Sequence, residues 1–159
     1  MVGGKAMDKV DHGPAVRFPP PFIFIGVAMI GPVIDWLLRL PSLPIPGGLS
    51  MIFLFPGFIL IGTAIGLFRR RGENPIPATP TGEVIDTGIY ARTRNPMYLG
   101  MAIAYPGLAI LLHSMPALLL WPLAILLVRK YVIAREEAYL EAKFGAPYLE
   151  YMNRVNRWF

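Results

Sequence analysis

The chain has 159 residues, of which 55% are hydrophobic and only 16% are charged, and its formal net charge is +5. With a mean hydropathy of +0.51, it is too apolar for an ordinary soluble domain and falls in the membrane class. It has no cysteine and only two histidines, which excludes a disulfide framework and a thiolate metal site, and we expect no metal. The basic residues flank apolar segments, so we expect membrane lipids and not nucleic acid as their partners.

Residues 1–21 are predicted to form an N-terminal cytoplasmic tail, which carries three basic residues and ends in three consecutive prolines. Residues 22–40 follow as the first apolar segment. At ~1.5 Å per residue this segment is long enough to cross ~30 Å of hydrocarbon. The sequence therefore predicts a transmembrane helix directly after the tail, with a kink at Pro32.

A second apolar segment covers residues 49–68. Within it, Gly62 and Gly66 lie four residues apart, a spacing that favours close helix packing, so we expect another helix to pack against these two glycines. Three arginines close the segment at 69–71, as basic residues do at the cytoplasmic end of a membrane helix. Residues 22–68 are thus predicted to hold two transmembrane helices.

The next two apolar segments, residues 98–113 and 117–134, are predicted to form a tight helical hairpin. The first of them is short for a full crossing of the membrane. The second has no stop signal at its end and is predicted to continue to Lys143, where Gly145 terminates it.

Four segments would place the N-terminal tail, the 69–97 loop and the C-terminal end on one side of the membrane. Of the fifteen Lys and Arg residues, only Arg39 would lie on the other side, and the positive-inside rule makes the basic side cytoplasmic. We therefore predict an all-α, multi-pass transmembrane bundle in which residues 69–159 form the functional core. The short loops favour a prokaryotic plasma membrane, and no oligomeric state is predicted.

Two polar junctions flank the hairpin on its cytoplasmic side. If the second junction is helical, Glu136 shares a stripe with Arg129 and Tyr139, and an inward-facing Glu136 needs a partner that the loop arginines can supply. The residues alone leave two interpretations open. The junctions form either a salt-bridge network that only fixes the loop to the helix, or a binding site. The junctions supply these side chains: Tyr90, Arg92, Arg94, Asn95 and Tyr98 from the loop, and Arg129, Arg135, Glu136 and Glu137 from the helix.

Several motifs, in order, resemble the C-terminal half of the isoprenylcysteine carboxyl methyltransferase family, whose signature is similar in phospholipid N-methyltransferases. The resemblance covers about residues 83–158. It implies an integral membrane enzyme that uses S-adenosylmethionine to methylate a lipophilic substrate. The motifs are Gly88-Ile89-Tyr90, Arg94-Asn95-Pro96-Met97-Tyr98-Leu99-Gly100, Glu136-Glu137, the stretch from Phe144 to Tyr151, and Arg154-Val155-Asn156-Arg157.

The resemblance also implies which residues form the pocket for the cofactor. Asn95 stands where the eukaryotic members have histidine, and since an amide does not titrate near neutrality, it favours a binding role over an acid–base role. The C-terminal tail from Tyr148 onward is implied to be a lid, with an aromatic interfacial belt as the alternative. Carried over by position, the cofactor-binding residues are Val84, Ile85, Tyr90, Arg94, Asn95, Pro96, Met97, Tyr98, Glu136 and Glu137.

The predicted reaction is an in-line displacement at a sulfonium, whose thioether leaving group is neutral, so the protein has to orient and desolvate the reactants. Because the junctions hold arginines and no histidine, they favour a carboxylate nucleophile, as in an isoprenylcysteine, over an amine, which must lose a proton. Arg129 or Arg135 is predicted to position that carboxylate. The alternatives are a phospholipid or amine N-methyltransferase, an NADPH-dependent membrane reductase of the steroid-reductase type, and a non-enzymatic adaptor.

Overall fold

The computed structural model describes residues 14, 16, 19–75 and 82–158, and within these ranges every regular element is helical. Most of the predicted N-terminal tail lies outside the described residues. The elements are α1 (Pro20–Leu38), η1 (Gly47–Ser50), α2 (Met51–Arg70), η2 (Gly88–Ala91), α3 (Pro96–Leu111), α4 (Met115–Leu119), α5 (Trp121–Val128), the π-helical turn η3 (Arg129–Ile133), α6 (Ala134–Phe144) and α7 (Ala146–Arg154).

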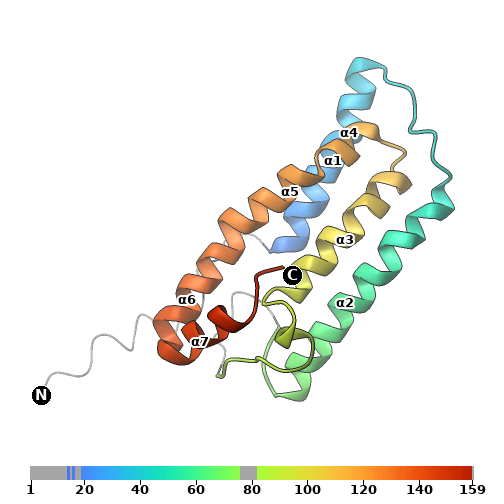
Figure 1. Ribbon diagram of the computed structural model, residues 1–159. Helices are drawn as coiled ribbons and strands as arrows, with labels where there is room; N and C mark the ends of the chain where they lie inside the picture. The colour runs from blue at the N-terminus through green and yellow to red at the C-terminus, as the bar shows by residue number, and fades with distance from the viewer. Residues whose placement is uncertain (1–13, 15, 17–18, 76–81, 159) are drawn as a thin grey trace, which may run out of the picture.

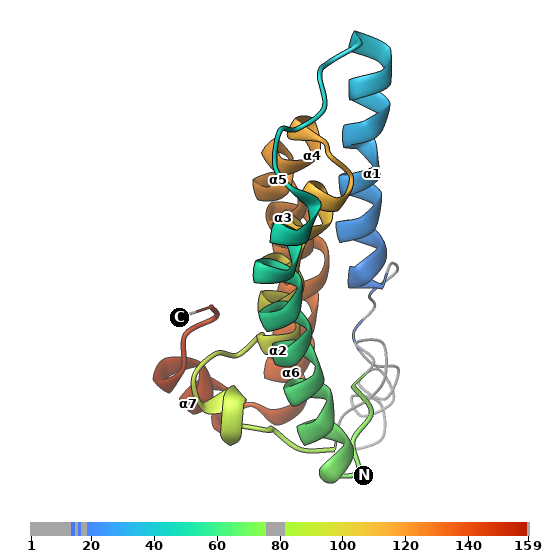
Figure 2. The same cartoon turned by 90° about the vertical axis from the view of Figure 1, so that its right-hand side faces the viewer.

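The long helices run side by side as an elongated bundle (Figure 1). α2 packs along α3, whereas α1 packs against α3, α4 and α5. Figure 2 shows that α1 stands apart from α2 and extends beyond the other helices. The segment between α2 and α3 lies at the same end of the bundle as α6 and α7 (Figure 1), so the two polar junctions meet there.

Two helical stretches, Pro20–Leu38 and Gly47–Arg70, are long and apolar enough to cross a membrane. Their large apolar side chains are widely exposed, for example Trp36 at 77% and Phe55 at 68%, which suits helices that face lipid. α3 is apolar but shorter. The crossing of the bilayer by α3 and by the α4–α6 run remains a prediction.

The contact between α2 and α3 depends on glycines other than the predicted pair. A Cβ atom on Gly57 would lie 2.6 Å from the Gly100 carbonyl oxygen, and one on Gly100 would lie 2.7 Å from the Gly57 carbonyl oxygen. Gly62 and Gly66 have no neighbour within 4 Å of that position, so the prediction that a helix packs on them is wrong. Gly57 shares its helical face with buried Ala64, and Gly62 and Gly66 point away from that face.

The hairpin follows the predicted course closely. The Ser114 hydroxyl accepts a hydrogen bond from the Ala117 backbone N–H at 3.1 Å and so caps α4. From Met115 the helical segments follow one another to Phe144, one residue beyond the predicted end. Gly145 then adopts a positive φ of 60°, which favours glycine.

The π-helical turn η3 changes the stripe predicted for this helix. Val132 is buried, and Glu136 and Tyr139 are partly buried, but Arg129 is exposed. A π turn holds more residues than an α turn, so a residue at its start is rotated away from the face that an α-helical period assigns to it. For this reason Arg129 does not share the inward face with Glu136.

Candidate functional site

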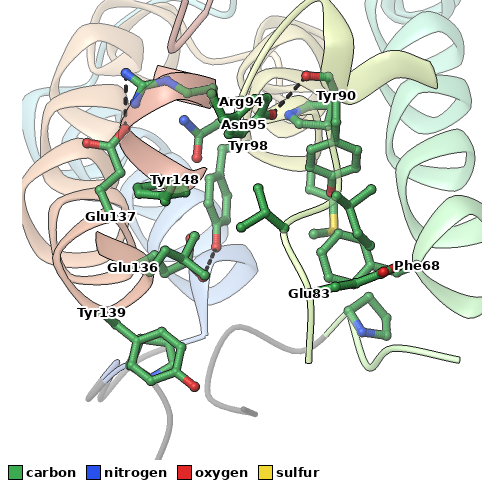
Figure 3. Close-up of a pocket in the computed structure, with 18 of the residues that line it drawn as sticks. Phe68, Glu83, Tyr90, Arg94, Asn95, Tyr98, Glu136, Glu137, Tyr139 and Tyr148 are labelled. Carbon is green, nitrogen blue, oxygen red and sulfur yellow. Dashed lines mark hydrogen bonds and ion pairs between the residues drawn. The ribbon is translucent and has the colours of Figure 1, made fainter. Parts of the chain in front are cut away.

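A cavity opens where the two junctions meet. It encloses about 820 Å³, counting its opening to solvent. Figure 3 shows its walls, which come from the end of α2, the loop before α3, the start of α3, α6 and α7. The lining residues are Pro14, Phe68, Asn74, Pro75, Glu83, Val84, Ile85, Tyr90, Arg94, Asn95, Pro96, Met97, Tyr98, Glu136, Glu137, Tyr139, Leu140, Tyr148 and Tyr151.

All ten residues predicted to bind the cofactor line this one cavity. Their placement brings together a loop and a helix about forty residues apart in the sequence. Arg129 and Arg135, the predicted catalytic residues, are exposed and are not among the lining residues. A role for them in positioning the substrate remains a prediction.

One wall of the cavity is aromatic and apolar. The rings of Phe68 and Tyr90 lie 5.4 Å apart, beside Ile85 and Met97. The Tyr151 hydroxyl donates to the Tyr90 backbone oxygen at 2.8 Å, which ties η2 to α7. The Tyr90 hydroxyl itself is buried and has no hydrogen-bond partner among the described residues, so it can serve a ligand.

The opposite wall carries Glu136. The Tyr98 hydroxyl donates to Glu136 Oε1 at 2.7 Å (Figure 3). The prediction that a loop arginine is the partner of Glu136 is therefore wrong. Tyr98 takes that place because it faces α6 from the first turn of α3. Burial is the main cause that raises the pKa of Glu136 to about 7; the Glu137 charge adds to the rise, and the hydrogen bond from Tyr98 opposes it.

The loop arginine pairs instead with the neighbouring Glu137. Arg94 Nη2 lies 3.4 Å from Glu137 Oε1, and Arg157 donates to the same carboxylate through Nε, at 3.0 Å, and through Nη2. Glu137 is only 8% exposed, so the pair of cations offsets the cost of burying its charge. Within the part of the chain that the structure describes, Arg94 Nε and Nη1 are buried and have no hydrogen-bond partner.

The C-terminal segment after α7 forms hydrogen bonds with the loop before α3 and holds that loop in place. The backbone oxygen of Arg157 accepts two hydrogen bonds, from Thr93 Oγ1 at 2.9 Å and from Asn95 Nδ2 at 3.3 Å. The backbone oxygen of Asn156 accepts a third, from the Arg94 N–H at 3.0 Å. Asn95 thus uses one amide hydrogen within the protein while it lines the cavity. Pro96 follows it at the start of α3, where its missing N–H leaves no helical bond unmade.

Helix α7 forms the cavity wall next to this segment. Tyr148 and Tyr151 are 2% and 5% exposed, so their rings belong to the packed interior. Burial raises the pKa of both phenols, and the charge of Arg94 opposes part of the rise. On the outside, Arg154 pairs with Asp86, a second link between α7 and the loop.

Sequence reasoning missed Arg157 as a functional candidate. Its signal was present, since Arg157 closes the last of the motifs that carry the family resemblance. No spacing rule relates a residue at the C-terminus to Glu137, because the contact depends on how α7 folds back on α6. Phe68, which also lines the cavity, lay in a segment treated only as membrane helix. Tyr139, another lining residue, was placed on the stripe of Glu136 but was given no role.

The arrangement suits a ligand with one aromatic and one zwitterionic part. The aromatic wall offers stacking surface and the Tyr90 hydroxyl. The polar wall offers the two spare nitrogens of Arg94 and the carboxylate of Glu136. Such a site binds and orients its ligand and excludes water.

Comparison with known proteins identifies the family of this chain. The sequence model of a family described as phospholipid methyltransferase matches residues 52–147, more than half of the chain. The match includes all of α2 except its first residue and all ten predicted cofactor-binding residues. An uncharacterized protein of Haemophilus influenzae is 39% identical over 62 residues, which are 39% of this chain and 78% of that protein. The chain therefore belongs to the phospholipid methyltransferase family, and it is a membrane methyltransferase of the kind that acts on lipid-like substrates.

Proposed function

We propose that the protein transfers the methyl group of S-adenosylmethionine to a lipophilic substrate at the cytoplasmic face of a prokaryotic plasma membrane. The observation that carries this proposal is the cavity, whose two walls differ in chemistry. One wall is aromatic, and the other holds a buried arginine with two unused nitrogens beside a buried carboxylate. A nucleoside that carries an amino acid with a free carboxylate and a free ammonium group has matching parts.

The residues present fit this cofactor. Arg94 Nε and Nη1 would donate to its carboxylate, and Glu136 would accept from its ammonium group or a ribose hydroxyl. The wall of Phe68, Tyr90 and Met97 would pack on the adenine. When bound, the cofactor supplies an electrophilic methyl group on a sulfonium. The side chains of the cavity hold it in place and exclude water, and they need not protonate the leaving thioether.

We propose a carboxylate as the first candidate nucleophile, giving a methyl ester. A carboxylate is ionised at neutral pH and needs no base, and the described residues that line the cavity include no histidine. A lipophilic carboxylate would need only a cation to orient it.

A specific observation favours a second candidate, an amine such as a phospholipid headgroup. The pKa of Glu136 is raised to about 7 by burial, which is the range in which a carboxylate can accept a proton from an ammonium group. The family match supports this candidate as well.

The first test is calorimetric titration of the detergent-purified protein with S-adenosylhomocysteine, alongside Glu136→Ala and Asn95→Ala. We expect micromolar binding that both substitutions weaken, because each removes a polar group from the cavity wall. No binding by the intact protein would overturn the proposal. Retention of NADPH would then favour a reductase. If the protein bound neither cofactor, an adaptor role would be favoured.

The chemistry of the product distinguishes the two nucleophiles. Membranes containing the protein would be incubated with cofactor labelled in its methyl group, and the extracted lipids treated with alkali. A methyl ester releases labelled methanol, whereas an N-methyl group stays bonded to its nitrogen and yields no volatile label. We expect methanol, and label that is stable to alkali would identify the amine reaction.

Exchange of Arg129 or Arg135 for alanine is expected to lower methyl transfer without changing affinity for S-adenosylhomocysteine. Both side chains are exposed, outside the cavity, on the helix that carries Glu136, so they would act on the substrate and not on the cofactor. The measurement is turnover as a function of substrate concentration. Unchanged turnover in both variants would remove them from the catalytic set.

A further inference from the structure

Arg157 makes the strongest contact with Glu137, although it comes from the far end of the chain. It holds both carboxylate oxygens of Glu137, Nε to Oε1 at 3.0 Å and Nη2 to Oε2. A paired contact of this kind between a guanidinium and a carboxylate is among the strongest that side chains form. Arg157 does not line the cavity.

Arg94 makes a weaker contact than Arg157 with the carboxylate of Glu137. Its contact with Glu137 is the 3.4 Å approach of Nη2 to Oε1, while Nε and Nη1 are buried and have no hydrogen-bond partner among the described residues. A buried guanidinium nitrogen without an acceptor is costly. The surrounding structure must therefore keep the Arg94 side chain in this place. The hydrogen bond from the Arg94 backbone N–H to the Asn156 oxygen contributes to this by fixing the backbone.

We propose that Arg157 is a positioning residue that occupies Glu137 so that Arg94 stays available to the anionic end of the ligand. The inference rests on the proposed function, in which that end is the carboxylate of the cofactor. In the absence of Arg157, Glu137 would have two oxygens and one neighbouring cation, and it would draw Arg94 into a paired contact. Arg157 therefore acts through Glu137 and Arg94, without touching the ligand.

Two ligands separate this role from a general effect on the fold. S-adenosylhomocysteine and 5′-methylthioadenosine share the adenine, the ribose and the thioether, but only the first has the carboxylate. In Arg157→Met we expect affinity for S-adenosylhomocysteine to fall about tenfold, in the range of one charged hydrogen bond. We expect affinity for methylthioadenosine to change less than about twofold.

A second substitution tests the path through Glu137. The amide in Glu137→Gln is neutral and does not draw Arg94 by charge, so the double variant Arg157→Met/Glu137→Gln should recover most of the lost affinity for S-adenosylhomocysteine. Arg154→Met is the matched control, because Arg154 pairs with Asp86 outside the cavity. We expect this control to leave both affinities unchanged.

The outcomes are distinct from those of the proposed function. If the intact protein binds neither ligand, the proposed function fails, and this inference fails with it. If the intact protein binds both ligands and Arg157→Met weakens them equally, or weakens neither, only the positioning role is overturned. A double variant that binds S-adenosylhomocysteine no better than Arg157→Met would also overturn that role.

Discussion

Replacing Gly57 with alanine is expected to destabilise the detergent-solubilised protein by about 1–3 kcal/mol, the usual cost of overpacking a tight contact. The added methyl group would lie 2.6 Å from the Gly100 carbonyl oxygen and 2.7 Å from the Ala104 Cβ. These are parts of helix α3 that no side-chain rotation can move. The two helices must therefore separate, and we expect a lower melting temperature in a thermal unfolding experiment.

Gly62→Ala in the same helix is the matched control. Its methyl group would meet nothing within 4 Å, and alanine favours a helix over glycine by up to ~1 kcal/mol. We expect this variant to equal or slightly exceed the parent in stability. If Gly57→Ala were as stable as Gly62→Ala, α2 and α3 would not approach each other as closely as described.

Affinity for S-adenosylhomocysteine is expected to fall about tenfold per pH unit as the pH drops below about 7. Burial raises the pKa of Glu136 to about 7, and the proposed contact with the ligand requires the ionised carboxylate. Protonation therefore competes with binding. Tyr98, which donates to Glu136, and the nearby Glu137 are the other titratable groups that act on it. Calorimetry between pH 5.5 and 8 would measure the slope.

The same pKa predicts how ligand and pH act together on stability. In the unfolded state the Glu136 carboxyl has its ordinary pKa, so between pH 4.5 and 7 the folded state binds more protons at Glu136 than the unfolded state does. The contribution of this carboxyl to the free energy of unfolding therefore decreases as the pH rises. Ligand that binds only the ionised form should raise the melting temperature more at pH 8 than at pH 5.5.

Glu136→Gln tests the assignment, with Glu141→Gln as its control. An amide at position 136 does not titrate, so we expect weak binding without the pH slope. Glu141 is exposed on the same helix and should leave the slope intact. A slope that survives in Glu136→Gln would place the titrating group elsewhere.

Several features of this protein follow from the sequence alone because their causes are local. Apolar runs and the positions of proline and glycine predicted the helices and the end of α6 at Phe144 within a residue or two. The alternation of apolar segments and basic loops predicted that the two junctions meet at one end. The motif order predicted the family, and with it ten of the residues that line the cavity.

The tertiary structure alone decided which groups touch. Gly57 and not Gly62 meets α3, because the direction of a helical face depends on where its partner crosses it. The π turn rotates Arg129 outward, and Glu136 and Glu137 take different partners because Tyr98 and Arg94 approach α6 from different points. Arg157 reaches Glu137 only because α7 folds back. Contacts between distant segments depend on packing geometry, which local sequence patterns do not encode.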